Sequence, residues 1–178
     1  LVNDPEVGDV DKTGLLPVKW VEEEEKWMIT TKEDSGWYDY TSSVNKWANV
    51  MLRDEMTLVD YDTTDTVIEN LAGKLVENSG SMFVWIPRYE YKIEGTYGKG
   101  GTSAVSPGEI EVNFILASQQ EPTSEYKIHS AFKFGDSILN GIWVGKFEIS
   151  HTTKTASSIG CVDEKCSEGN NLRVLPNK

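Results

Sequence analysis

The fold of this chain is predicted mainly by two segments, Ser81-Met-Phe-Val-Trp-Ile-Pro-Arg-Tyr-Glu-Tyr-Lys-Ile93 and Asn140-Gly-Ile-Trp-Val-Gly-Lys-Phe-Glu-Ile-Ser150. Both are rich in β-branched and aromatic residues, which favour strands. After Pro87 and after Gly145, apolar residues alternate with polar ones, as they do in a strand with one buried face. We therefore expect two core strands, with Pro87 at a sheet edge or bulge that turns Arg88.

Further elements are predicted around these two segments. Residues 109–116 (Glu-Ile-Glu-Val-Asn-Phe-Ile-Leu) alternate cleanly and indicate a strand. Residues 66–76 place apolar side chains with the spacing of one helical face, although Gly73 weakens the pattern. The expected core, on strands that pair in one sheet, consists of Phe83, Trp85, Ile110, Val112, Phe114, Phe132, Trp143 and Phe147.

Tryptophan-rich hairpins are predicted in residues 15–65. The first runs from residue 16 to residue 31 around four glutamates, and the second joins residues 36–40 to residues 46–51. Exposed aromatic rings are one way in which sugar-binding modules stack on glycans, whereas a small hairpin with little aliphatic core must bury its aromatic rings. The tentative ligand-binding residues are Trp37, Tyr38, Tyr40 and Trp47, with burial in the core as the alternative.

The expected organisation is an extended arm over residues 1–14, the tryptophan-rich region over residues 15–65, and a β-dominated domain over residues 66–178. The arm is polar and contains turn-forming residues. Its Asp9-Val-Asp-Lys-Thr-Gly14 stretch begins like a calcium loop, but Trp20 stands where a bidentate glutamate is required. We expect an acidic turn there and predict no metal site and no cofactor.

The charge of the chain excludes some classes of partner. Its 178 residues include 29 acidic and 17 basic ones, a formal net charge of −12. Nucleic acids and anionic membrane surfaces both require a basic face, so we expect neither as a partner. No run of apolar residues is long enough to span a bilayer, and residues 1–6 do not resemble a signal peptide, so an export segment would already have been removed.

The two cysteines, Cys161 and Cys166, enclose four residues in a tail rich in serine, glycine and asparagine. The two histidines, His129 and His151, are not at zinc-finger spacing from them. We expect a local disulfide, with free thiols as the alternative, and a disulfide indicates a location outside the cytosol. Because the loop is short, its contribution belongs at the low end of the usual ~2–4 kcal/mol.

No catalytic set is predicted. His129 stands beside Ser130, but no third residue is placed to orient the ring, so we expect His129 to form a structural hydrogen bond at a strand end. Paired carboxylates of the kind that hydrolyse glycosides are also considered, although alternation places them on the solvent face. These carboxylates are Glu90, Glu109, Glu111 and Glu148.

Several blocks of the sequence resemble a known family. The order Met82-Phe-Val-Trp-Ile-Pro87, His129-Ser-Ala-Phe132 and Gly141-Ile-Trp-Val-Gly-Lys-Phe-Glu148 is similar to the opening half of formylglycine-generating-enzyme-like modules, which have C-type-lectin-like topology. The Gly141–Glu148 block also resembles bacterial and prophage surface proteins, which often carry a prepilin-like leader, together with Leu16-Pro-Val-Lys-Trp20, Trp37-Tyr-Asp-Tyr40 and Lys46-Trp-Ala-Asn49. The resemblance covers residues 15–178. It implies an α+β, β-dominated fold of antiparallel sheets and hairpins with one or two short helices.

This resemblance implies a protein without catalysis. The catalytic cysteines and metal site of the enzymes belong to the later half of the module, and we expect this chain to end before that half begins. Cys161 and Cys166 do not match the redox pair. We therefore expect an extracellular structural subunit of a bacterial pilus-like filament, surface appendage or phage virion, which self-associates by exchanging a strand or terminal segment. A surface adhesin or carbohydrate-binding module that binds a glycan is the alternative.

Overall fold

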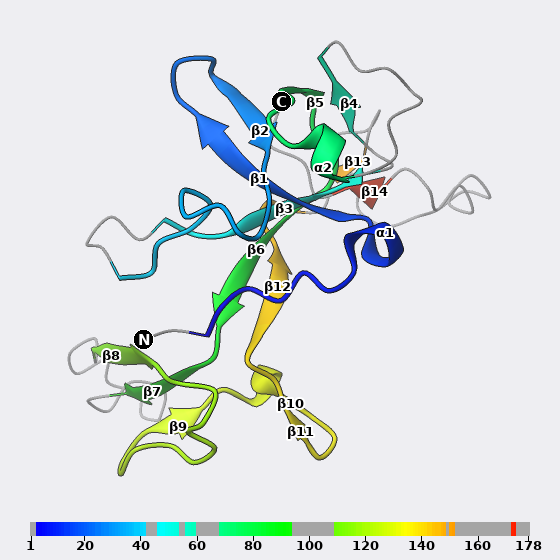
Figure 1. Ribbon diagram of the computed structural model, residues 1–178. Helices are drawn as coiled ribbons and strands as arrows, with labels where there is room; N and C mark the ends of the chain where they lie inside the picture. Colours follow the sequence, from blue (N-terminus) through cyan, green and yellow to red (C-terminus); the bar gives the residue numbers. More distant parts are fainter. Residues whose placement is uncertain are drawn as a thin grey trace. The chain divides into compact units, whose positions relative to one another are not determined.

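The computed structural model describes residues 3–41, 46–53, 56–59, 68–93, 109–148, 150–151 and 172–173 (Figure 1). Strands dominate this part of the chain, which confirms the β-dominated prediction. Its helices are short: α1 (Val10–Thr13), α2 (Ile68–Leu71) and a 3-10 helix (Ser130–Phe132). None of these helices is long and apolar enough to cross a membrane.

The chain divides into two compact units, each made from separate stretches of sequence. The first unit contains residues 1–6 and 86–142, and the second contains residues 7–85 and 143–178. Cys161 and Cys166 lie outside the described residues, as do residues 60–67.

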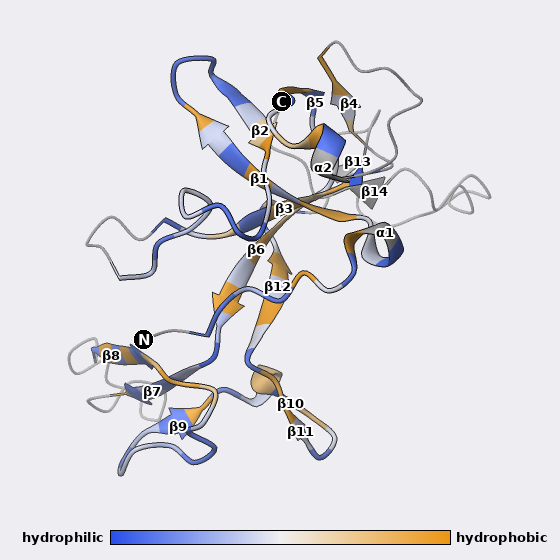
Figure 2. Ribbon diagram, in the orientation of Figure 1, coloured by the Kyte–Doolittle hydropathy of each residue, from blue (hydrophilic) through white to orange (hydrophobic). Residues whose placement is uncertain are grey.

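The main sheet of the chain has five strands in the order β12-β6-β3-β1-β2 and belongs mostly to the second unit. Its strands are β1 (Leu15–Val21), β2 (Lys26–Ile29), β3 (Asn49–Leu52), β6 (Met82–Pro87) and β12 (Gly141–Gly145). The pairs β1–β2, β1–β3 and β3–β6 are antiparallel. Figure 2 shows apolar residues along β6 and β12, the two segments predicted as core strands. Each segment contributes a strand to this sheet, but β6 ends at Pro87 and β12 ends at Gly145, so the alternating residues after Pro87 and Gly145 do not continue these strands.

The first predicted hairpin is confirmed as β1–β2, closed by the pair Val21↔Lys26. Its turn is the exposed run Glu22–Glu25, where solvent screens the four like charges. In the described residues, the second predicted hairpin is represented by the antiparallel bridge Asp39↔Lys46. Residues 49–52 instead form β3 and pair with β1 and β6, where their side chains gain more burial than a small hairpin offers.

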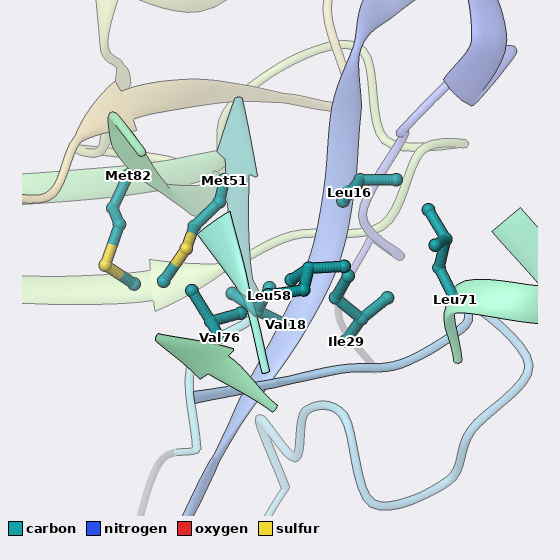
Figure 3. Packing of buried hydrophobic residues seen from close by; sticks show 8 residues of the cluster. All are labelled: Leu16, Val18, Ile29, Met51, Leu58, Leu71, Val76 and Met82. Atoms are coloured by element: carbon teal, nitrogen blue, oxygen red, sulfur yellow. The ribbon is translucent and has the colours of Figure 1, made fainter. Parts of the chain in front are cut away.

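Aliphatic and methionine side chains form the core of the second unit (Figure 3). The cluster consists of Leu16, Val18, Ile29, Met51, Leu58, Leu71, Val76 and Met82. Besides the sheet and α2, two short antiparallel strands contribute to it, β4 (Thr57–Leu58) and β5 (Val76–Asn78). Burial of each large side chain contributes roughly 1.5–3 kcal/mol.

The prediction of a helix over residues 66–76 is wrong for the second half of that range. In the described part, α2 ends at Leu71, and Val76 already belongs to β5. Gly73 has φ +86°, the left-handed conformation that commonly terminates a helix. The apolar spacing is compatible with a helix, but the backbone of Gly73 interrupts it.

The first unit contains a three-stranded antiparallel sheet with the order β8-β7-β9. Its strands are β7 (Tyr89–Ile93), β8 (Ile110–Phe114) and β9 (Lys127–Ile128). The 3-10 helix follows β9 and leads into a hairpin of β10 (Lys133–Phe134) and β11 (Ser137–Ile138). Two further short strands of the chain, β13 (Ser150–His151) and β14 (Leu172–Arg173), pair with each other.

The expected single-sheet core is wrong in two respects. Its strands belong to different sheets, because β8 pairs with β7 and not with β6. Trp85 and Phe132 are buried, but Ile110 and Val112 are 63% and 52% exposed. Alternation shows which residues share a face of a strand, but another layer must cover that face before it becomes core.

The segment expected to form an arm contains α1 and two buried side chains. In the first unit, the side-chain amide of Asn3 donates to the carbonyl oxygens of Ile115 and Asn140, each at 3.0 Å. In the second unit, Val7 is 4% exposed. Asn3 and Val7 therefore pack into the fold, and the segment is not a free extended arm at these positions.

Candidate functional site

The open side of β8 is the most unusual surface that the described residues present. Among the described strands, β8 is the outer strand of its sheet, and we call its side away from β7 the β8 edge. Apolar Ile110 and Val112 on one face are exposed, and so are polar Glu111 and Asn113 on the other. Proteins normally protect an edge strand with lysine, proline, a bulge or a covering segment, because unpaired backbone groups are a template for another strand.

One face of the β7–β8 pair is apolar along its whole length. The pairs on this face are Ile93↔Ile110, Tyr91↔Val112 and Tyr89↔Phe114. At one end the face is covered, since the rings of Tyr89 and Phe132 lie 5.2 Å apart at an edge-to-face angle. At the other end Ile93 is 52% exposed, like its neighbours on β8.

The opposite face of the same strands is polar and carries its own interactions. The hydroxyl of Tyr126 donates to the carboxylate of Glu111, and this hydrogen bond raises the pKa of Tyr126. The ammonium of Lys92 lies 3.0 Å from the carboxylate of Glu125. The β8 edge is therefore amphipathic, with the two faces separated by the pleat of the strand.

Backbone geometry fixes which groups of β8 point outward. The amide of Ile115 donates to the carbonyl oxygen of Arg88 at 3.1 Å, so the backbone groups of Ile115 face β7. In an antiparallel strand, successive residues direct their N–H and C=O groups to alternate sides. The backbone groups of Glu111 and Asn113 therefore face β7 as well, and those of Ile110 and Val112 face the open side.

The four predicted ligand-binding aromatics do lie together. Neighbouring ring centroids are 5.5 Å apart for Trp37 and Tyr38, 5.4 Å for Tyr38 and Tyr40, and 5.5 Å for Tyr40 and Trp47. However, Trp37 is 1% exposed and Tyr40 is 8% exposed, whereas Tyr38 and Trp47 are half-buried. In this structure Trp37 and Tyr40 offer no free ring face to a sugar, which agrees with the core alternative for these two.

The polar atoms of these two buried aromatics are hydrogen-bonded. The indole of Trp37 donates to the carbonyl oxygen of Asn49 at 2.9 Å. The hydroxyl of Tyr40 donates to the carbonyl oxygen of Trp85 and accepts from the amide of Ala48, each at 3.2 Å. Burial raises the pKa of Tyr40 far above its usual range. Trp37 and Tyr40 thus attach residues 37–40 to the main sheet.

Two charged residues, Arg88 directly before β7 and Glu90 within it, are buried, and neither was predicted to be. Arg88 is fully buried, and its Nη2 donates to the carbonyl oxygens of Leu116 and Ala117 at 2.8 and 3.0 Å. Among the described residues, Nε and Nη1 of Arg88 have no hydrogen-bond partner. Burial lowers the pKa of Arg88.

The prediction that all four candidate carboxylates lie on the solvent face is wrong for Glu90. It was expected on the solvent face but is 3% exposed, and the loop residues Gln119 and Thr123 contact its carboxylate. Its carboxylate accepts from the amide of Thr123 at 2.6 Å and from the side chain of Gln119 at 3.2 Å. Strand alternation carries no signal for such contacts, which only the tertiary fold reveals.

The remaining candidate site residues lie in a helix cap or on the exposed surface. The ring of His129 accepts a hydrogen bond from the amide of Ala131 at 3.2 Å and caps the 3-10 helix, as expected for a structural residue at a strand end. Glu109, Glu111 and Glu148 are exposed. Within the described ranges, no group of three or more histidine, cysteine or acidic side chains is arranged to hold a metal ion.

In comparisons with known proteins, no protein-family model, curated protein or solved structure matches this chain. The resemblance to formylglycine-generating-enzyme-like modules and to bacterial surface proteins therefore stays a prediction.

Proposed function

We propose that this protein is a non-catalytic structural subunit of an extracellular bacterial assembly, either a pilus-like filament or an appendage of a cell surface or phage, which associates with itself through an exposed strand. The observation that carries the proposal is the β8 edge. Strand addition at such an edge supplies main-chain hydrogen bonds, and the alternating side chains set the register.

The composition of β8 favours association through this edge, because the strand lacks most of the residues that usually protect an edge. The strand Ile110–Phe114 contains no lysine, proline or glycine, and a single charged residue, Glu111. Its two exposed apolar residues and Ile93 opposite form a contiguous apolar surface on an otherwise acidic protein. Contiguous exposed apolar surface beside an open strand edge is typical of an interaction site.

The location and the finer fold rest on the sequence. An extracellular place follows from the resemblance to bacterial and prophage surface proteins and from the expected disulfide of Cys161 and Cys166. The proposed fold is C-type-lectin-like, and a neighbouring subunit would add a strand at the β8 edge. Exchange of the segment 1–14 or of the segment 168–178 is the alternative route to the same assembly.

The proposal is tested by measuring association of the intact chain. We expect sedimentation velocity to show assembly that rises with protein concentration, and electron microscopy to show regular particles or filaments. Val112→Lys places a charge in the β8 edge and should reduce the assembled fraction at least tenfold. Ile138→Lys, which changes an exposed apolar residue on β11, is the matched control and should leave assembly intact.

The intact chain staying monomeric at the highest concentrations would overturn the proposal. Equal loss of assembly in Val112→Lys and Ile138→Lys would show that general hydrophobicity, and not the β8 edge, drives association.

A further inference from the structure

We infer that Arg88 binds a small monovalent anion, such as chloride or a carboxylate, through its Nε and Nη1 atoms. The inference does not depend on the proposed assembly, because Arg88 directly precedes β7 and none of the residues that carry the inference belongs to β8. Three observations on the described residues support it: the guanidinium is buried, most of its donors have no partner, and no carboxylate contacts it.

The guanidinium of Arg88 is buried with most of its donors unused. Arg88 is 0% exposed. Of the five N–H donors of an arginine side chain, two belong to Nη2, which bonds to the carbonyl oxygens of Leu116 and Ala117. The donor on Nε and those on Nη1 have no hydrogen-bond partner among the described residues. Because buried polar groups are nearly always hydrogen-bonded, these unused donors point to a bound acceptor.

The charge of Arg88 is not offset by an ion pair. In the part of the chain that the structure describes, no carboxylate oxygen lies within ion-pair distance of its nitrogens. The two carbonyl oxygens that it contacts are neutral, and a buried cation requires opposite charge or a full set of hydrogen bonds to offset its lost hydration. An anion supplies both, whereas a water molecule supplies hydrogen bonds alone. This difference favours an anion over an ordered water.

Glu90, two residues further along the chain, limits the charge of the ligand. The amide of Ile115 donates to the carbonyl oxygen of Arg88, so Arg88 continues the ladder of β7 and shares a face with Glu90. The carboxylate of Glu90 is already held by the amide of Thr123 at 2.6 Å and by the side chain of Gln119 at 3.2 Å. Because its negative charge repels an anion at Arg88, a monovalent anion is favoured over a divalent one such as sulfate.

An exposed loop gives the anion a route to Arg88. Leu116 and Ala117, whose carbonyl oxygens contact the guanidinium, are themselves exposed, and so are residues 120–125. Segments with few buried apolar contacts open locally at low cost. We therefore expect a brief opening of residues 116–123 to admit a small ion without unfolding the sheet.

Amide exchange in salts of equal ionic strength tests the inference. Sodium chloride and sodium acetate supply small anions, whereas the anion of sodium gluconate is too large for a buried site, so the comparison removes general screening of the net charge of −12. Binding should slow exchange of the β7 amides several-fold in chloride, because a ligand that binds only the closed state reduces the open population. The tryptophan fluorescence midpoint should not differ between the salts, since all six tryptophans belong to the second unit.

A matched pair of substitutions assigns the effect to Arg88. Arg88→Met removes the charge and the donors but keeps a long side chain, and it should abolish the chloride dependence of β7 exchange. Lys133→Met removes an exposed cation from β10 of the same unit and should leave the dependence unchanged.

Glu90→Gln tests the inference in the opposite direction and leaves Arg88 in place. The substitution removes the neighbouring negative charge but keeps an oxygen that can accept from Thr123, so chloride should bind several-fold more tightly. Line broadening of the chloride nuclear magnetic resonance signal measures the affinity of the intact chain and of this variant directly. The test therefore stands even if Arg88→Met disrupts the first unit.

Each outcome either supports the inference or overturns it. Slower exchange in acetate alone would identify a carboxylate as the ligand, and slower exchange in chloride would identify a free ion. Equal exchange in all three salts would overturn the inference and assign the donors of Arg88 to ordered water. Loss of the chloride dependence in Lys133→Met, or an unchanged chloride affinity in Glu90→Gln, would also overturn it. None of these results decides the proposed assembly, which sedimentation of the intact chain tests separately.

Discussion

Asp34 joins three parts of the second unit through one carboxylate. Its Oδ2 accepts from the ammonium of Lys19 on β1 at 2.7 Å and from the hydroxyl of Thr30, and its Oδ1 accepts from the amide of Gly36 at 2.7 Å. The hydrogen bond from Lys19, then those from Thr30 and Gly36, hold the pKa of Asp34 well below its usual value of 3.8. All of these bonds favour the ionised carboxylate.

Asp34→Asn should lower the free energy of unfolding by about 1–2 kcal/mol at pH 7, the range for hydrogen bonds to a charged group. Because the folded pKa lies below the unfolded one, the stabilisation is fully present above about pH 4 and is lost as the pH falls through the folded pKa. Urea unfolding at pH 7 and about pH 3 measures it, and the difference between variant and wild type should shrink at the lower pH.

Asp136→Asn, in an exposed turn, is the control and should change stability little at either pH. A loss for Asp34→Asn that stayed constant over this range would mean that side-chain shape, and not ionisation, matters at position 34.

Substitution of Trp37 tests whether its ring belongs to the core or to a glycan-binding surface. Trp37→Ala should cost about 3–5 kcal/mol, because it removes a buried ring and the donor to the Asn49 carbonyl. Tyr38→Ala, at the half-buried neighbour, should cost much less. Chemical denaturation measures both losses, and a loss below about 1 kcal/mol for Trp37→Ala would show that the ring is not part of the core.

At the scale of elements, the alternation of apolar and polar residues predicted where strands lie, but not which faces of the strands are covered. The expected strands at β1, β2, β6, β7 and β8 are present, because period-two patterns and turn residues are local signals. The exposure of Val112 and the burial of Glu90 depend on which segments cover a face, and no local pattern encodes that. The same limit applies to the candidate site: the aromatic cluster is visible in the sequence, but the exposure of Ile110 and Val112 on β8 is not.

The β10–β11 hairpin depends on the backbone of Gly135. This residue has φ +61° at the first central position of a two-residue turn, where a side chain is strained although open space surrounds it. Gly135→Ala should destabilise the hairpin by about 1–2 kcal/mol, whereas Asp136→Ala, at the next position, where φ is not positive, should cost less. Amide exchange of residues 133–138 measures the effect, and equal losses for the two variants would contradict it.

At the scale of the whole molecule, the two units have unequal cores. In the described part of the second unit, buried apolar side chains come from the five-stranded sheet and the elements packed on it, including Leu16, Met51 and Met82. In the first unit, the fully or nearly fully buried apolar side chains described are Pro87, Ile115 and Phe132, beside the buried charges of Arg88 and Glu90. The first unit therefore gains less hydrophobic stabilisation and carries the desolvation cost of two charges.

This imbalance predicts that the two units lose structure at different denaturant concentrations, the first unit before the second. All six tryptophans belong to the second unit, so tryptophan fluorescence follows that unit alone. Amide exchange of β7 and β8 follows the first unit. We expect β7 and β8 amides to exchange through a low-energy opening that leaves the tryptophan signal unchanged, since regions with few buried apolar contacts open locally.

Paired substitutions separate the two transitions. Phe132→Ala should weaken protection in β7 and β8 by about 3–5 kcal/mol and leave the tryptophan midpoint in place. Leu16→Ala should lower the tryptophan midpoint by an amount that corresponds to about 2–5 kcal/mol. If Phe132→Ala moved the tryptophan midpoint as far as Leu16→Ala does, the chain would unfold as one cooperative body, and the weaker first unit could not open independently to exchange a strand with a neighbour.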